Sequence, residues 1–343
     1  MSLRSLEKAE SGEALLTLIQ ARKAAAVYER PFVVLFLPAP PEEDPPEVQF
    51  RRLRDAPALP WAPPMRVLAR EVPALQDEAD ALFEALEEHP RWPDAAGIFA
   101  REPDPERLGA AVRQLVGVSV QLQKAAARTD PQGFRAFRVW REAIEQLGVL
   151  VLQDGTLPLE EMRGFAVPHR RVPALVINSN DDVRARLFTM LHEFAHLFWT
   201  GREESRYEEF AAAALMPRDE FARDFHAAAG RTLLEKVDAL ARQYATTPDA
   251  TAVRVGWLQI ASWEVIREVR AEIRERGGRG SRASGGTHYR NIVARLGPQF
   301  VTRVLGAVET SAMSELAAAR LLGIRVERFD ELRRELSGAR EVA

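Results

Sequence analysis

Residues 187–198 read LFTMLHEFAHLF, an apolar run that carries His192, Glu193 and His196. On a helix, two histidines four residues apart lie one above the other on the same face. Their imidazoles can therefore bind one Zn²⁺ from the same side. Glu193 lies one position round the helix, where its carboxylate can reach a water on the metal. The run predicts a zinc-binding helix with Glu193 as the catalytic base of a metallopeptidase.

The alternative for this pattern is a pair of histidines on a solvated or partly buried helix face, with no metal. Two observations weigh against it. The chain has only six histidines, yet two of them fall at ligand spacing. The flanking residues are also strongly apolar, and a buried imidazole needs a partner to offset its desolvation, which a metal supplies.

The third zinc ligand is harder to assign from the residues. Zinc normally takes at least three protein ligands, and the chain has no cysteine, so the third is a histidine or a carboxylate. Gly201 is a plausible end for the first helix, and a second helix is expected over about 203–216, ended by Pro217. Glu204 and Glu208 share one face of that helix. Either glutamate can turn toward the metal.

Residues 140–260 resemble the ImmA/IrrE family of bacterial metallopeptidases. The resemblance is carried by Met162-Arg163-Gly164-Phe165, Pro173-Ala174-Leu175-Val176-Ile177-Asn178-Ser179, His192-Glu193-Phe194-Ala195-His196, and Phe210-Ala211-Ala212 followed by Leu215-Met216-Pro217. It implies Zn²⁺ as the cofactor and Glu204 as the third ligand, with Glu208 in reserve. The chain departs from the family in Tyr207-Glu208, where alanine or cysteine followed by asparagine is usual. The eight-residue step from His196 to Glu204 is also unusually short.

The resemblance further implies a function. Such proteins look like dedicated proteases that cleave helix-turn-helix repressors in stress response, phage defence or mobile-element control. The expected partner is thus a protein substrate, a helix-turn-helix repressor or antitoxin, with nucleic acid reached only indirectly through that partner. The alternative is a non-proteolytic antitoxin or regulatory binding module of a toxin–antitoxin pair that retains a zinc site. The two departures from the family favour this alternative.

The expected fold class is α+β: a mainly helical, zincin-like domain with a small sheet. Leu175, Val176, Ile177 and Asn178 are expected to form an edge strand that pairs with substrate backbone, and Ser179 or Asn180 to cap the zinc helix. Five regions are expected along the chain. The ends of the chain resemble the branch of the family that is fused to an Xre-type helix-turn-helix, and this resemblance implies an N-terminally truncated, Xre-like remnant over 1–64, with a helix over 5–28, a strand over 32–37 and a proline-rich arm. The other four regions are a helical segment over 65–130, the metallopeptidase domain over 131–276, a glycine-rich linker over 277–287, and a C-terminal helical segment over 288–343.

Composition bounds the remaining possibilities. The 343 residues are 46% hydrophobic, enough for a substantial core. The 47 basic and 50 acidic residues give a net charge of −3, which excludes an unselective nucleic-acid binder. No apolar run approaches the roughly 18–20 residues that span a bilayer, and the first residues lack the pattern of a secretory signal. A cytoplasmic location without membrane contact is expected.

Overall fold

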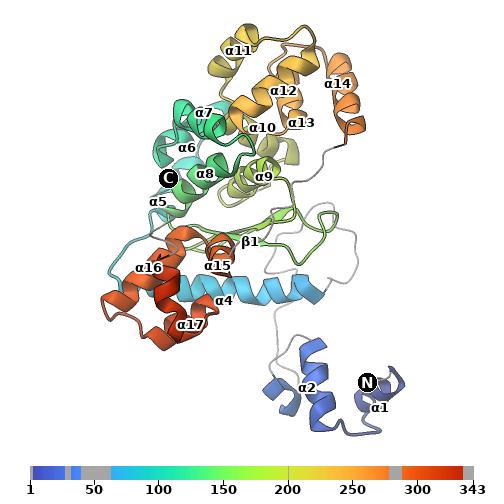
Figure 1. Ribbon diagram of the computed structural model, residues 1–343, viewed down its shortest axis with the longest axis vertical. Coiled ribbons are helices and arrows are strands. Elements are labelled where there is room, and N and C mark those ends of the chain that lie inside the picture. Colours follow the sequence, from blue (N-terminus) through green and yellow to red (C-terminus); the bar gives the residue numbers. More distant parts are fainter. Residues whose placement is uncertain (1–2, 28–31, 40–62, 200, 278–287, 335–343) are drawn as a thin grey trace. The chain divides into compact units, whose positions relative to one another are not determined.

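The computed structural model describes residues 3–27, 32–39, 63–199, 201–277 and 288–334 (Figure 1). The chain divides into two compact units, Met1–Glu71 and Val72–Ala343. Helix α4 (Pro63–Ala85) crosses the border between them. Most of the expected proline-rich arm, residues 40–62, lies outside the described residues, and the arm's last two prolines open α4.

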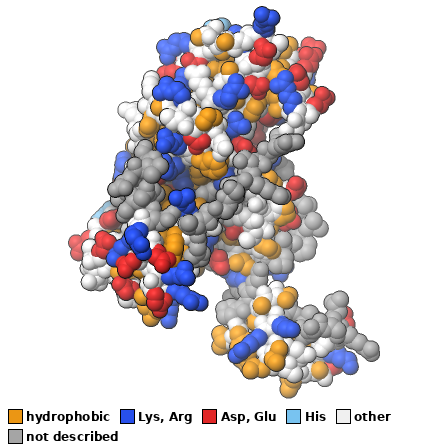
Figure 2. Space-filling model, viewed as in Figure 1, with side chains coloured by type: hydrophobic (Ala, Val, Ile, Leu, Met, Phe, Trp, Pro, Cys, Tyr) orange, Lys and Arg blue, Asp and Glu red, His pale blue; other side chains and the backbone are white. Residues whose placement is uncertain are grey.

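Besides the start of α4, the described part of the first unit contains α1 (Leu3–Glu10), α2 (Leu18–Val27) and the 3₁₀ helix η1 (Phe32–Phe36). The helix expected over 5–28 is therefore two helices, and Gly12, with φ +78°, lies in the turn between them. Figure 2 shows hydrophobic side chains on the surface of this unit. Leu15, Ile19 and Phe36 are among the large apolar residues that are exposed there.

The strand predicted over 32–37 is wrong, because these residues form the helical turn η1. The rings of Phe32 and Phe36 meet edge to face with centroids 5.0 Å apart. A strand would place residues four apart at a distance of about 13 Å. The guanidinium of Arg22 lies 5.6 Å from the centroid of the Phe32 ring. These local contacts favour a helical turn over an extended backbone at residues 32–36.

The described residues of the second unit are mainly helical with one three-stranded sheet, which confirms the expected α+β class. After α4, its elements are α5 (Trp92–Phe99), α6 (Pro105–Val116), α7 (Val120–Thr129), α8 (Phe134–Glu145), β1 (Leu150–Asp154), β2 (Gly164–Val167), β3 (Ala174–Asn178), α9 (Val183–His196), α10 (Glu204–Leu215), α11 (Arg218–Ala227), α12 (Leu233–Tyr244), α13 (Pro248–Trp257), α14 (Trp263–Glu275), α15 (His288–Leu296), α16 (Pro298–Glu309), α17 (Glu315–Leu322) and η2 (Val326–Arg328). Among the described helices, none has the length and apolar content needed to cross a membrane.

The sheet has the strand order β1-β3-β2, with β3 parallel to β1 and antiparallel to β2. The edge strand expected at Leu175, Val176, Ile177 and Asn178 is therefore wrong: this strand is central, and all five residues of β3 are buried. A continuous apolar run is typical of a strand covered on both faces. It does not tell which strands lie beside it.

Helix α9 packs against β2 and β3 on one side of the sheet, and the second half of α4 lies on the other (Figure 1). Gln76 of α4 is buried and donates hydrogen bonds from Nε2 to the carbonyls of Val167 (3.0 Å) and Val172 (3.1 Å). Helix α15 packs against β1, where Gln153 Nε2 donates to the carbonyl of Ala294 (2.9 Å). Residues 278–287 of the expected linker lie outside the described residues.

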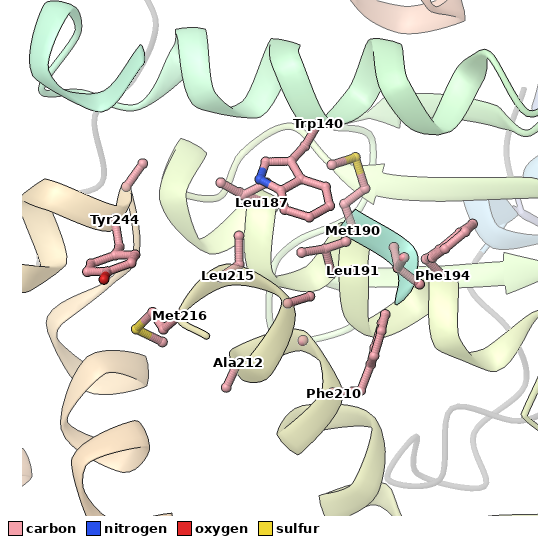
Figure 3. Close-up of a cluster of buried hydrophobic side chains, with 14 of the residues drawn as sticks. Trp140, Leu187, Met190, Leu191, Phe194, Phe210, Ala212, Leu215, Met216 and Tyr244 are labelled. Atoms are coloured by element: carbon pink, nitrogen blue, oxygen red, sulfur yellow. The ribbon is translucent and has the colours of Figure 1, made fainter. Parts of the chain in front are cut away.

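A single hydrophobic core joins α5–α8 to α9 and α10. Phe99, Leu108, Trp140, Phe194 and Phe210 all have 0% exposure within it. Figure 3 shows Trp140 of α8 above Leu187 and Leu191 of α9, with Leu215 and Phe210 of α10 beside them. The core has no break at the border expected between residues 130 and 131. The helical segment before that border is part of the body that supports α9 and α10.

Candidate metal centre

Helix α9 places His192 and His196 at the surface of this core. Asp182 caps the helix, accepting a hydrogen bond from the backbone N–H of Arg184 (2.9 Å), so the cap is neither Ser179 nor Asn180. The apolar residues of α9 (Leu187, Met190, Leu191, Phe194) are fully buried. Their burial fixes the rotation of the helix. The two histidine side chains are consequently left partly exposed, at 13% and 28%.

Helix α10 begins at Glu204, so its first turn supplies the acidic side chain that faces α9. Seven residues, 197–203, join the two helices. Phe210 and the four alanines in the second half of α10 are buried, so this helix is part of the core rather than a surface arm. Glu208, one turn further along, is exposed.

Two buried arginines hold the C-terminal end of α10. Arg113 of α6 donates to the carbonyls of Ala214 and Leu215, and Arg254 of α13 donates to that of Met216. Arg254 also forms a two-pronged ion pair with Glu106, with N–O distances of 2.7 and 2.8 Å. Cations at a helix C-terminus oppose the negative end of its dipole. These contacts fix the axis of α10, and so the position of Glu204 at its other end.

The three candidate ligand side chains converge. His192 Nε2 lies 3.2 Å from His196 Nε2, and Glu204 Oε1 lies 2.7 Å from the first nitrogen and 3.7 Å from the second. In the part of the chain that the structure describes, this trio is the one group of histidine and acidic residues whose ligand atoms come together closely enough for a metal ion. Glu208 is not part of it.

The geometry and chemistry of the trio fit zinc. Ligands held tetrahedrally at about 2.0–2.1 Å from a zinc ion lie roughly 3.3 Å from one another. The histidine pair is at 3.2 Å, and the two histidine–glutamate separations of 2.7 and 3.7 Å lie on either side of that value. Two neutral imidazoles and one carboxylate are a common donor set of catalytic zinc sites with an open fourth position.

The charges of the trio support one another. The hydrogen bond from His192 lowers the pKa of Glu204. Burial opposes the charge on His192, yet its bond to Glu204 and the nearby Glu193 raise its pKa overall. The 2.7 Å contact joins His192 Nε2 to the Glu204 carboxylate. A metal that binds here takes the place of a proton on this nitrogen, so binding at this site releases protons.

Glu193 is buried beside the trio, at 7% exposure. Burial raises its pKa to about 7, against the opposing effect of His192. Strand β2 makes room for it at Gly164, where an added Cβ would lie 2.7 Å from Thr189 Cγ2, 3.1 Å from the carbonyl oxygen of Val176 and 3.2 Å from Glu193 Cγ. Sequence reasoning missed this role of Gly164. A glycine inside an apolar strand is itself a signal of close approach by another group.

One of the comparisons with known proteins gave a match. Residues 144–255 match the family model of the IrrE N-terminal-like domain, a peptidase family. This segment, about a third of the chain, is similar to the IrrE N-terminal-like peptidases. Neither the curated proteins nor the solved structures gave a match. The IrrE-like segment runs from the end of α8 to α13 and holds all four site residues, whereas Arg113 and Glu106 lie before it.

Two other histidines, His169 and His226, lie outside the trio. His169 Nδ1 accepts hydrogen bonds from the backbone N–H groups of Arg171 (3.3 Å) and Val172 (3.0 Å), so its ring stabilises a turn. His226, on α11, is exposed. Tyr207, in contrast, is buried against the ligands.

Proposed function

We propose that the chain is a zinc-dependent, site-specific endopeptidase that cleaves a partner regulatory protein. His192, His196 and Glu204 hold the zinc, and Glu193 is the general base and then the general acid. The observation that carries this proposal is the convergence of two imidazole nitrogens and a carboxylate oxygen next to a buried glutamate, within a segment of a peptidase family.

The chain's own contribution to catalysis is proton transfer and orientation. When bound, zinc supplies a Lewis acid that polarises a carbonyl and acidifies water. The Glu193 carboxylate accepts the proton of the attacking water and later donates it to the departing amine. In the metal-free protein burial raises the pKa of Glu193 to about 7, and a nearby Zn²⁺ would lower this pKa, which keeps the carboxylate ionised and able to accept the proton.

Strand β2, rather than β3, is the better candidate for binding extended substrate. The backbone N–H of Asn178 donates to the carbonyl of Arg163 (2.8 Å), so Arg163 belongs to a hydrogen-bonded pair with β3. Alternate residues of an outer antiparallel strand turn their N–H and C=O groups away from the partner. Gly164 and Ala166 therefore face outward, and Gly164 adjoins Glu193. A peptide added there would run beside the general base.

We further propose a helix-turn-helix repressor as the substrate, on the strength of the resemblance to ImmA/IrrE proteins. The non-proteolytic alternative drew its support from the short connection between the two helices and from Tyr207-Glu208. Neither feature keeps Glu204 away from the imidazoles, whose nitrogens lie within 3.7 Å of its carboxylate. The alternative also retains a zinc site, so this approach of Glu204 fits both functions, and cleavage of a partner is the result that separates them.

The test is co-expression with the product of the adjacent gene, followed by intact-mass analysis of that product. Wild-type protein should cut the partner once, and Glu193→Gln should leave it intact while binding one equivalent of zinc. Glu204→Gln should lose zinc, whereas the matched variant Glu208→Gln should retain it. Cleavage by Glu193→Gln would exclude the proposed mechanism, and zinc loss in Glu208→Gln with retention in Glu204→Gln would exclude the proposed ligand.

A further inference from the structure

Tyr207 contacts the connection between the two ligand-bearing helices on both of its described sides, at Trp199 and at Arg202. Tyr207 lies on α10, three positions after Glu204, and its side chain is 3% exposed. Its ring lies over the imidazole of His196, with centroids 3.9 Å apart and an angle of 37° between the planes. It also meets the His192 ring edge to face at 5.9 Å.

The Tyr207 hydroxyl is occupied by the backbone of the connection. It donates to the carbonyl of Trp199 (3.3 Å) and accepts from the N–H of Arg202 (3.2 Å). A phenolic hydroxyl has one proton to donate. Because that proton is directed at Trp199, it is not directed at a reacting carbonyl. The geometry therefore argues against Tyr207 as a hydrogen-bond donor to the negatively charged oxygen that develops on a reacting carbonyl.

Trp199 connects residues 197–199 to the rest of the second unit. Its side chain is 2% exposed, and its Nε1–H donates to the carbonyl of Glu102 (3.1 Å), just before α6. Its ring packs edge to face on Phe210, with centroids 6.2 Å apart. The connection is thus tied at Trp199 to residues before the IrrE-like segment and at Tyr207 to α10 itself.

We propose that Tyr207 is a positioning residue of the metal centre. Its ring limits rotation of the His196 imidazole, and its hydroxyl fixes the connection that places Glu204. This inference rests on the metal centre of the proposed function. Residues that orient metal ligands typically contribute a factor of about 10–100 to metal affinity. An alanine at position 207 would offer neither the ring contact nor the hydroxyl.

Two variants separate the ring from the hydroxyl. Tyr207→Phe removes the hydroxyl alone, and Tyr207→Leu removes the ring as well. Tyr244→Phe is the matched control: Tyr244 is also buried, and its hydroxyl donates to Asp224 Oδ2 (2.6 Å), on α11. All three variants remove the hydroxyl of a buried tyrosine: that of Tyr207 bonds two backbone groups, and that of Tyr244 bonds a carboxylate. A purely structural role predicts similar behaviour for Tyr207→Phe and Tyr244→Phe.

The measurements are zinc affinity by chelator competition, the visible spectrum of the Co²⁺-substituted protein, and exchange of the Arg202 amide proton in metal-free protein. We expect zinc binding about 10–100-fold weaker for Tyr207→Leu, an intermediate loss for Tyr207→Phe, and a shifted Co²⁺ spectrum for both. The Arg202 amide should exchange faster in Tyr207→Phe. Tyr244→Phe should match wild type in all three.

Equal zinc affinities and Co²⁺ spectra for the Tyr207 variants and Tyr244→Phe would overturn the proposal. Failure of the wild type to cleave any partner would count against the peptidase function while leaving the metal measurements valid. If wild-type protein bound no metal, the proposed centre would be wrong. If the Arg202 amide exchanged at an unchanged rate in Tyr207→Phe, the proposed role of the Tyr207 hydroxyl in fixing the connection would be refuted as well.

Discussion

Replacing Glu193 with glutamine should stabilise the metal-free protein at neutral and alkaline pH. The side chain is buried at 7% exposure, and burial raises its pKa from 4.5 to about 7. Glutamine has nearly the same shape and cannot ionise. The variant therefore avoids a buried negative charge that the wild type must carry once the pH exceeds the folded-state pKa.

The magnitude follows from the pKa difference between the folded and unfolded states. Below pH 4.5 both states hold the proton, and the two proteins should be equally stable. Between pH 4.5 and 7 the unfolded wild type ionises first, so its stability falls as the pH rises, by about 1.4 kcal/mol per pH unit. Above pH 7 the difference levels off at about 3 kcal/mol in favour of Glu193→Gln.

The assay is urea unfolding of both proteins in chelator at several pH values from 4.5 to 8.5, with Glu208→Gln as a control because its parent side chain is exposed. The free-energy gap should appear for Glu193→Gln only. Added zinc should reduce this difference in unfolding free energy, because a nearby dication favours the ionised carboxylate of Glu193. A gap that does not change with pH, or a variant less stable than the wild type at pH 8, would refute the reasoning.

Two further predictions concern glycines that permit close packing. Gly164→Ala places a Cβ within 3.2 Å of Thr189, Glu193 and the Val176 carbonyl, so we expect a loss of roughly 1–3 kcal/mol in urea unfolding and weaker peptidase activity. Gly109→Ala brings a Cβ to 2.8 Å from the backbone nitrogen of Ala214, which cannot move aside without shifting α10; a similar loss in stability should accompany weaker zinc binding. Gly306→Ala is the matched control, because it has open space inside α16 and should gain up to about 1 kcal/mol from helix propensity. A Gly109→Ala protein as stable as Gly306→Ala would contradict the packing argument.

The zinc helix could be predicted from the sequence because its signal is local. The i, i+4 spacing of His192 and His196 brings their rings together through helix geometry alone, and the apolar flanks show which side of the helix is buried. The small sheet within a mainly helical domain could also be expected, because Leu175–Asn178 and its neighbours are rich in strand-forming residues.

Two predictions were wrong because a local sequence pattern was used for a structure that depends on distant segments of the chain. Residues 32–37 are apolar and bounded by prolines, as a strand would be, yet the structure pairs them with no other strand of the described chain. Likewise, the apolar composition of β3 indicates burial on both faces but says nothing about its neighbours. Its central position depends on β1 and β2, which pair with it from elsewhere in the chain.

By itself, then, the sequence determined the identity and spacing of the two imidazoles and the adjacent carboxylate. The tertiary structure decided which acidic group approaches them. Glu204 and Glu208 are equivalent by helical spacing, and the choice follows from how Arg113, Arg254 and Tyr207 hold α10 against α9. The contacts that hold α10 and the connection before it come from residues about 40 to 100 positions away in the chain. No local periodicity encodes such distances, because they are set only when the whole core packs.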